Sequence, residues 1–222
     1  MDEVSQVGDV VASLGECPVW SDTEQVLYWA DIEGRKIHRY EPASNTIETR
    51  DLAGRPGSFV LTDRAGTLLV AMETDLLWLD WATGTTSLFV NVEASVAGNR
   101  LNDGRCDHGG RYIVGTMHPV PDDGHAQGSL YSISTEGAVD ELETGVTVPN
   151  GLAFDHDRGR MYWIDSPTFI IWVWDYDFEM GRRTNKRVFF DYSAHPEAEG
   201  TGDGGCLDED GFYWSASVYG WA

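Results

Sequence analysis

The chain has 222 residues and a formal net charge of −22, from 37 acidic and 15 basic side chains. This charge repels the phosphate backbone of nucleic acids and the surface of acidic membranes, so neither is expected as a partner. Apolar residues make up 41% of the chain, with nine Trp and nine Tyr, which excludes a disordered chain and predicts a large core. The N-terminus is acidic where a secretory signal is basic, and no apolar run approaches the roughly 18 residues of a membrane helix. The expected location is the cytoplasm.

Taken in chain order, the predicted elements are almost all β-strands. Short runs rich in β-branched and aromatic residues are separated by Gly, Asp, Asn and Pro. The runs are VLYWADI, KIHRYEP, TLLVAM, LLWLDW, RYIVGTM, SLYSIS, RMYWID and FYWSAS. Because no long stretch has helical periodicity, the sequence predicts an all-β fold.

An internal repeat appears when these runs are aligned on an Asp-containing turn. The aligned aspartates are Asp22, Asp63, Asp107, Asp155 and Asp208, which gives a period of roughly 40 to 53 residues. This period suits a four-stranded sheet repeated around an axis, the blade of a β-propeller. Five repeats are visible. The turn assignment also means that Asn102-Asp103-Gly104, despite its turn-like composition, belongs to a strand.

Polar side chains recur at one point of the repeat. Five residues before the anchor aspartates lie Ser58, Asn102, Asn150 and Asp203, and six residues before the first anchor lies Glu16. In a propeller this point is near the start of the innermost strand, where side chains from different blades converge on the central channel. Glu16, Asn102, Asn150 and Asp203 would together form an all-oxygen site.

Such a set predicts a bound divalent cation. Burying two carboxylates together is costly unless a counter-charge is present. Carboxylate and amide oxygens favour Ca²⁺, with Zn²⁺, Mn²⁺ and Mg²⁺ as alternatives. The other interpretation is that Asn102 and Asn150 are turn residues and that Glu16 and Asp203 are solvated.

The remaining reactive residues show no competing motif. The chain has three cysteines, Cys17, Cys106 and Cys206, and no two of them form a C-x-x-C pair. Free, buried thiols are therefore expected, and the alternative is that a thiolate contributes to metal binding. The six histidines lack ligand spacing, and G-x-S-x-G, H-E-x-x-H and G-x-x-x-x-G-K-[ST] do not occur.

Several motifs together resemble a known family. GECPVW, NRLNDGRCD followed by GTM, VPNGLAFD, YWIDS and DGGCLDEDG occur in order over nearly the whole chain. They are similar to motifs of the SMP-30/gluconolactonase/luciferin-regenerating enzyme family, which includes regucalcin and bacterial sugar lactonases. The resemblance implies a six-bladed β-propeller with a divalent metal in the central channel, and hydrolysis of sugar lactones.

The resemblance also implies roles for individual residues. Glu16, Asn102, Asn150 and Asp203 match the metal-ligand positions, with Asn102 acting either directly or through water or substrate. Arg100 matches an arginine that contacts the sugar, and Asn102 also touches the substrate. Arg100 and Asn102 are two residues apart, so they face the same way on an extended strand.

One segment departs from the family pattern. Regucalcin-like members have a glutamate after GTM that contacts the sugar hydroxyls, whereas Val120 falls near that position here. His118, Asp122, Asp123 and His125 are candidates to replace this contact from a lid; alternatively, the segment is simply a polar loop. The preferred sugar lactone is therefore not predicted.

A second departure is length. We expect residues 1–222 to form a single β-propeller domain with about five blades' worth of sequence, in which blade five is unfinished and blade six is absent. An unclosed propeller exposes strand edges with unpaired backbone groups. We therefore expect an unstable scaffold, although all the predicted ligands precede the break.

The predicted reaction is metal-assisted hydrolysis of a sugar lactone. The cation would polarise the lactone carbonyl while a carboxylate, with Asp203 as the candidate, takes a proton from the attacking water. Two alternatives keep the same site: a non-catalytic calcium-binding propeller, and cleavage of organophosphates or other esters. Arg100 and the polar segment after GTM favour catalysis, because a purely structural metal site requires neither. No oligomeric state follows from the sequence.

Overall fold

The structure of the protein is a computed structural model, which describes residues 6–120 and 127–220. Within these residues the chain forms four four-stranded antiparallel sheets and one two-stranded sheet, and the only helices are two short 3-10 turns. Blade 1 consists of β1 (Gly15–Ser21), β2 (Val26–Asp31), β3 (Lys36–Glu41) and β4 (Thr46–Asp51). Blade 2 consists of β5 (Pro56–Leu61), β6 (Thr67–Met72), β7 (Asp75–Asp80) and β8 (Thr86–Asn91).

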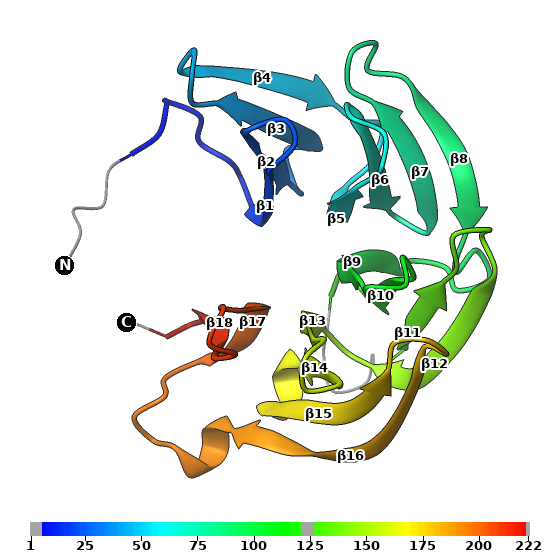
Figure 1. The fold of residues 1–222 in the computed structure, drawn as a ribbon, viewed down its shortest axis with the longest axis vertical. Coiled ribbons are helices and arrows are strands. Elements are labelled where there is room, and N and C mark those ends of the chain that lie inside the picture. The colour runs from blue at the N-terminus through cyan, green and yellow to red at the C-terminus, as the bar shows by residue number, and fades with distance from the viewer. Residues whose placement is uncertain (1–5, 121–126, 221–222) are drawn as a thin grey trace.

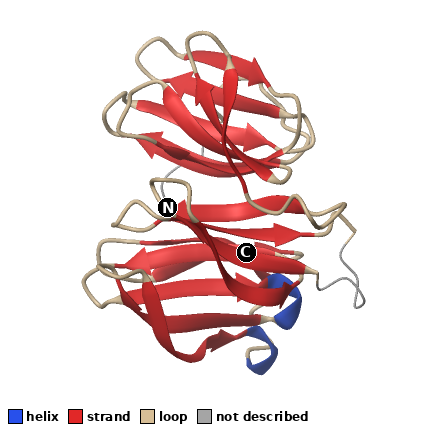
Figure 2. Ribbon diagram, turned by 90° about the vertical axis from the view of Figure 1, so that its right-hand side faces the viewer, coloured by secondary structure: helices blue, strands red, loops and turns tan. Residues whose placement is uncertain are grey.

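The other sheets follow the same order. Blade 3 consists of β9 (Arg100–Cys106), β10 (Tyr112–Met117), β11 (Gly128–Ile133) and β12 (Val139–Val146). Blade 4 consists of β13 (Pro149–Asp155), β14 (Arg160–Asp165), β15 (Ile170–Asp177) and β16 (Arg182–Asp191). The two-stranded sheet consists of β17 (Thr201–Leu207) and β18 (Tyr213–Val218). The short helices are η1 (Ser166–Thr168) and η2 (Tyr192–Ala194), which Figure 2 shows in blue beside the strands and their connecting loops.

The sheets are arranged around a common centre as in a β-propeller. Figure 1 shows them following one another in chain order, with the first strand of each sheet innermost. Neighbouring inner strands are in contact: β1 with β5, β5 with β9, β9 with β13, and β13 with β17. The all-β propeller prediction is confirmed, and four blades are complete.

The hydrophobic core lies between adjacent blades rather than at the centre. Tyr28 of blade 1 packs in one cluster with Phe59 and Leu68 of blade 2. A second cluster joins blades 2 and 3, and a third joins blades 3 and 4. Since blade 3 lies between blades 2 and 4, its middle strands are buried on both sides. For example, all six residues of β10 are buried.

The predicted turns are confirmed, and Asn102-Asp103-Gly104 lies inside β9. Asp107, in the turn after β9, accepts hydrogen bonds from the backbone N–H groups of Gly109 and Arg111 at 2.8 and 2.9 Å. Asp208 accepts from the backbone N–H of Phe212 in the corresponding turn after β17. These carboxylates hold the turns closed, which is why an aspartate recurs there.

The repeat offset of six in blade 1 has a simple structural reason. Asp155 is the last residue of β13 and pairs with Arg160. The corresponding last residue of β1 is Ser21, which pairs with Val26, so Asp22 lies one residue farther along. Glu16 and Asn150 therefore occupy the same position in their blades.

No helix in the described ranges, 6–120 and 127–220, is long and apolar enough to cross a membrane.

Candidate functional site

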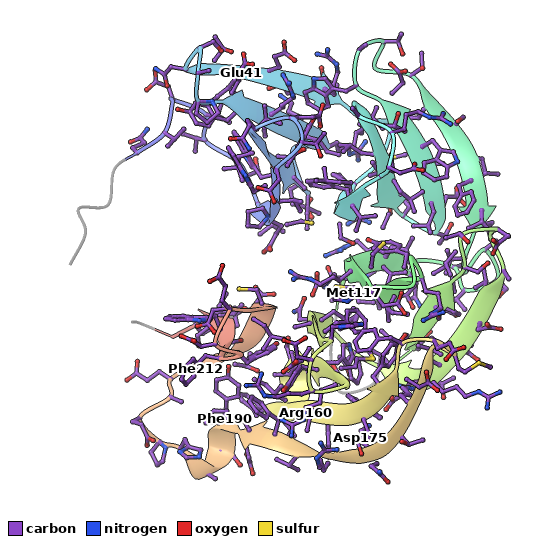
Figure 3. The ribbon with its side chains drawn as sticks, in the orientation of Figure 1. Glu41, Met117, Arg160, Asp175, Phe190 and Phe212 are labelled. Atoms are coloured by element: carbon purple, nitrogen blue, oxygen red, sulfur yellow. The ribbon has the colours of Figure 1, made fainter. Side chains whose placement is uncertain are left out.

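A cavity of about 1770 Å³ lies where the innermost strands come together. Met117, which lines it, is close to the centre of the molecule in Figure 3, whereas Glu41 and Asp175 lie towards the outer edge. The cavity lining includes every predicted metal or substrate contact: Glu16, Arg100, Asn102, Asn150 and Asp203. Residues from four separate sheets are thus brought to one place.

Each candidate ligand lies beside a β-bulge near the start of its inner strand. The pairing shifts between Glu16 and Val19 in β1, and between Asn150 and Ala153 in β13. Equivalent irregularities occur in β9 and in β17 around Asp203. A bulge inserts an extra residue and redirects nearby side chains, and bulges are common at functional sites.

A continuous chain of hydrogen bonds orients the buried polar side chains. Arg100 Nη1 donates to Asn102 Oδ1 at 2.7 Å, and Asn102 Nδ2 donates to Asn150 Oδ1 at 3.0 Å. Asn150 Nδ2 in turn donates to Ser166 Oγ at 2.9 Å, and that hydroxyl donates to the carbonyl of Gly202. The chain joins blade 3 to blade 4 and to the strand that carries Asp203. The two amides are therefore oriented before any ligand arrives.

Carboxylates gather on the cavity wall without an equal number of cations. Burial, together with the charges of Asp203 and Asp103, raises the pKa of Glu16 to about 7, and the charge of Arg100 opposes the shift. Burial likewise raises the pKa of Asp203, with Asp103 adding to the effect. This arrangement disfavours full ionisation of the group unless a positive charge is supplied.

Asp103 is a cavity residue that the sequence analysis missed. Its Oδ2 accepts a hydrogen bond from the backbone N–H of Leu152 at 3.3 Å, and burial raises its pKa. On a regular strand Asp103 would face away from Asn102, since successive side chains alternate. Both line the cavity because β9 is irregular between Leu101 and Gly104. In the sequence, only the position of Asp103 directly after the candidate ligand Asn102 could have indicated that it lines the cavity.

Ser58 has a supporting role at the corresponding point of blade 2. Its hydroxyl donates to the backbone carbonyl of Asn102 at 2.5 Å and lies 2.7 Å from the hydroxyl of Tyr112. Ser58 is fully buried, so it fixes the backbone that carries Asn102 rather than facing the cavity.

The three cysteines line the cavity but differ in exposure. Burial raises the pKa of Cys17 to about 12 and that of Cys106 to about 11, so both are neutral thiols at pH 7. This favours the packing interpretation over a thiolate ligand. All three thiols are free, as predicted, but Cys17 and Cys106 are only partly buried and Cys206 is exposed, so the prediction of burial was wrong for Cys206. Cys17 and Cys106 pack against hydrophobic clusters between neighbouring blades, whereas Cys206 belongs to none of these clusters.

The segment after GTM is described only in part. The backbone N–H of Val120 lies 3.3 Å from Nδ1 of His118. Asp122, Asp123 and His125 lie outside the described residues. Their proposed contact with substrate therefore stays a prediction.

The donor set fits a hard divalent cation. Within residues 6–120 and 127–220, no three His, Cys, Asp or Glu side chains are grouped as a metal site. A cation here therefore depends on amide oxygens from Asn102 and Asn150 in addition to the carboxylates of Glu16 and Asp203. This mixture is typical of Ca²⁺ sites. The pKa values of both carboxyl groups are raised, so their ionised forms are disfavoured in the metal-free protein. The positive charge of a cation would stabilise these ionised forms.

Comparison with known proteins gives relatives of similar sequence. The chain is 35% identical over 219 residues to the pentonolactonase of Haloferax volcanii, an alignment that covers 96% of this chain and 69% of the relative. It is also 35% identical over 212 residues to the 6-deoxy-6-sulfogluconolactonase of Pseudomonas putida, with 93% and 69% covered. The chain thus spans about 69% of the length of these relatives.

The fold has close structural neighbours as well. The structure described as the calcium-binding protein regucalcin from Agrobacterium tumefaciens superposes with a TM-score of 0.86 at 26% identity, covering 95% of this chain and 70% of the other. Residues 14–222 match the sequence pattern of the SMP-30/gluconolactonase/LRE-like region. The chain therefore belongs to the SMP-30/gluconolactonase/LRE-like family.

Proposed function

We propose that the protein hydrolyses sugar lactones to aldonic acids in the central cavity, using a divalent cation held by Glu16, Asn150 and Asp203. Asn102 would complete the set directly, or through water or substrate. The observation that carries the proposal is the convergence of these side chains from separate sheets in one cavity. Relatives named as lactonases of two different sugar classes support the reaction type.

When bound, the cation would polarise the lactone carbonyl and balance the charge of the acidic cavity wall. Ca²⁺ is the favoured ion because the candidate ligands are all oxygens. The structural neighbour described as a calcium-binding protein is consistent with that choice. Zn²⁺, Mn²⁺ and Mg²⁺ are the alternatives to be compared.

The chain's own residues would orient the substrate and move protons. Arg100 is buried and directs Nη1 at Asn102 Oδ1, and its remaining N–H groups would donate to the sugar ring or its hydroxyls. Asp203 would accept a proton from the water whose oxygen attacks the carbonyl carbon. The bond to the ring oxygen then breaks and that oxygen is protonated, which leaves the open hydroxy acid. Burial raises the pKa of Asp203 in the metal-free protein, and a bound cation would oppose this shift.

We also propose that residues 1–222 belong to one domain built on the six-bladed plan. Adjacent blades share continuous hydrophobic clusters instead of separate cores, which supports a single domain. The chain would supply four complete blades and the first two strands of the fifth.

A second candidate function is calcium binding without catalysis, in which the cation only ties the blades together. The neighbour described as a calcium-binding protein favours this possibility. The two functions differ at Arg100, because a guanidinium cannot ligate a cation but can donate hydrogen bonds to a sugar.

The deciding experiment is acid release from a panel of five- and six-carbon aldono-1,4- and 1,5-lactones. Metal-stripped protein receives Ca²⁺, Zn²⁺, Mn²⁺ or Mg²⁺ in turn, and cation binding is followed separately by calorimetry. Metal-dependent acid release supports the lactonase. Cation binding with no release from any lactone contradicts it and favours the calcium-binding function.

A further inference from the structure

A buried carboxylate, Glu93, lies outside the cavity in the connection between β8 and β9. Its side chain accepts hydrogen bonds from three neutral donors: Asn99 Nδ2 at 2.8 Å, Thr116 Oγ1 at 2.9 Å and the Tyr131 hydroxyl at 2.8 Å. The residue is only 3% exposed. Burying a polar group is costly unless it is hydrogen-bonded, and here three donors satisfy the carboxyl group. The carboxylate thus joins the β8–β9 connection to two strands of blade 3.

Other blades hold the corresponding connection differently. In blade 1, Asp31 at the end of β2 accepts from the backbone N–H groups of Ser13 and Leu14, which precede β1. In blade 4, Asp165 accepts from the backbone N–H groups of Thr147 and Val148 in the same way. Blade 3 reverses this arrangement, because the carboxylate lies in the connection and the strand supplies a hydroxyl donor, Thr116.

Asn99 transmits this contact to the candidate site. It directly precedes Arg100, and it is 3% exposed. Its Nδ2 group donates both to Glu93 and to the backbone carbonyl of Gln127, at 3.1 Å. Oδ1 of Asn99 is buried and meets no donor within the part of the chain that the structure describes. A buried acceptor without a donor lowers the stability of the fold. The two hydrogen bonds of Nδ2 hold the amide in this orientation although Oδ1 stays unpaired.

The start of β9 is thus held from several sides. Leu101 N donates to the carbonyl of Glu73, and Leu101 pairs with Thr116, the residue that donates to Glu93. Arg100 lies between Asn99 and Leu101, and its Nη1 donates to Leu101 O at 3.0 Å and to Asn102. The direction of the guanidinium therefore depends on the backbone that Glu93 and Asn99 fix.

We propose that Glu93 and Asn99 are positioning residues for substrate binding, which set the orientation of Arg100 from outside the cavity. The inference rests on the proposed function, since it assigns Arg100 to the substrate. Neither residue touches the cavity, so neither takes part in the chemical step. Their loss is expected to weaken substrate binding much more than it slows turnover.

The test compares Glu93→Gln and Asn99→Ala with the matched control Asp107→Asn. Asp107 is also a buried carboxylate with several donors, including the Tyr176 hydroxyl at 2.8 Å, but it lies at the opposite end of β9. Glutamine keeps the shape of Glu93, but its NH₂ group cannot accept a hydrogen bond. At least one of the three donors that now bind the carboxyl group therefore loses its acceptor. On the best lactone of the panel, we expect KM to rise about tenfold in both test variants with kcat changed less than about threefold. The control should leave KM unchanged.

A second measurement does not depend on activity. Hydrogen–deuterium exchange of the metal-free protein should speed up at residues 99–101 in Glu93→Gln but not in Asp107→Asn. An unchanged KM, or unchanged exchange at residues 99–101, overturns the inference. If the wild-type protein releases no acid from any lactone, the proposed function fails, and the exchange result alone then decides whether Glu93 positions Arg100.

Discussion

Glu16 and Asp203 belong to β1 and β17, the first and last inner strands of the arc, yet the charge of one raises the pKa of the other. At the scale of single residues, burial is the largest cause of the raised pKa of both carboxyl groups, and the charge of Asp203 adds to the shift of Glu16. Both carboxyl groups are partly buried, and Asp103 adds a third acidic group to the same wall. Predictions for these residues follow from their charge and position.

Asp203→Asn should lower the rate of lactone hydrolysis by a factor of at least about 100, because an amide cannot accept the proton of the attacking water. Initial rates with saturating cation and lactone measure the effect. The control is Asp208→Asn, since Asp208 closes the turn at the other end of the same strand. Near-wild-type activity of Asp203→Asn would exclude Asp203 from the mechanism.

The raised pKa of Glu16 predicts how the stability of the metal-free protein depends on pH. The folded-state value of about 7 lies above the ordinary value of 4.5, so between these values the folded state binds more protons than the unfolded state. The free energy of unfolding should therefore fall as pH rises from about 4.5 to about 7. Urea unfolding in the presence of a chelator measures it.

Glu16→Gln is the matched variant for this pH effect. The amide does not titrate, so its stability should fall less over the same pH range than that of the wild-type protein. Equal pH dependence of the two proteins would show that Glu16 is not the group responsible.

At the scale of the strand, β-bulges redirect the side chains of the candidate site. The repeat pattern in the sequence does not predict these bulges. Each inner strand carries an irregularity in pairing next to its site residue. In β13 the bulge includes Gly151, with φ of 65°. A Cβ at this position would collide with the hydroxyl of Tyr213, which donates to the carbonyl of Gly151. Glycine is thus required both by the backbone and by the approach of β18.

Gly151→Ala should lower the free energy of unfolding by about 2 kcal/mol or more, from backbone strain and the lost contact with Tyr213. The control is Gly66→Ala, because Gly66 also has positive φ, 71°, but its Cβ would meet no atom within 4 Å. The control should cost only about 1 kcal/mol. Equal losses in urea unfolding would mean that the contact with Tyr213 contributes nothing.

At the scale of the whole molecule, a cation at the candidate site would connect sheets that are distant in sequence. Glu16 comes from blade 1, Asn150 from blade 4 and Asp203 from the two-stranded sheet. Blade 4 and the two-stranded sheet share a hydrophobic cluster, but no cluster of the described residues joins either of them to blade 1. The cation would add that connection. Binding should therefore stabilise the entire fold.

Ca²⁺ at a hundred times its dissociation constant should raise the free energy of unfolding by about 2.7 kcal/mol. Thermal unfolding with and without chelator measures the shift. The Glu16→Gln variant should show a much smaller shift, since it loses a charged ligand. A wild-type midpoint that does not respond to any of the four cations would contradict the metal site.

The sequence by itself determined the architecture and most of the site. Strand-forming runs, a repeated aspartate turn and one recurring polar position are local features, because turn chemistry and side-chain period are set within a few residues. They were enough to predict an all-β propeller and to select Glu16, Asn102, Asn150 and Asp203, and the family resemblance added Arg100. All five line the cavity.

Only the tertiary structure decided which other residues surround these five. Asp103 faces the cavity because a bulge interrupts the alternation that sequence reasoning assumes. Cys206 is exposed because it packs into none of the hydrophobic clusters that cover Cys17 and Cys106. Glu93 reaches Thr116, 23 positions away along the chain. Such contacts depend on how strands distant in sequence pack together, and no local pattern of residues encodes that distance.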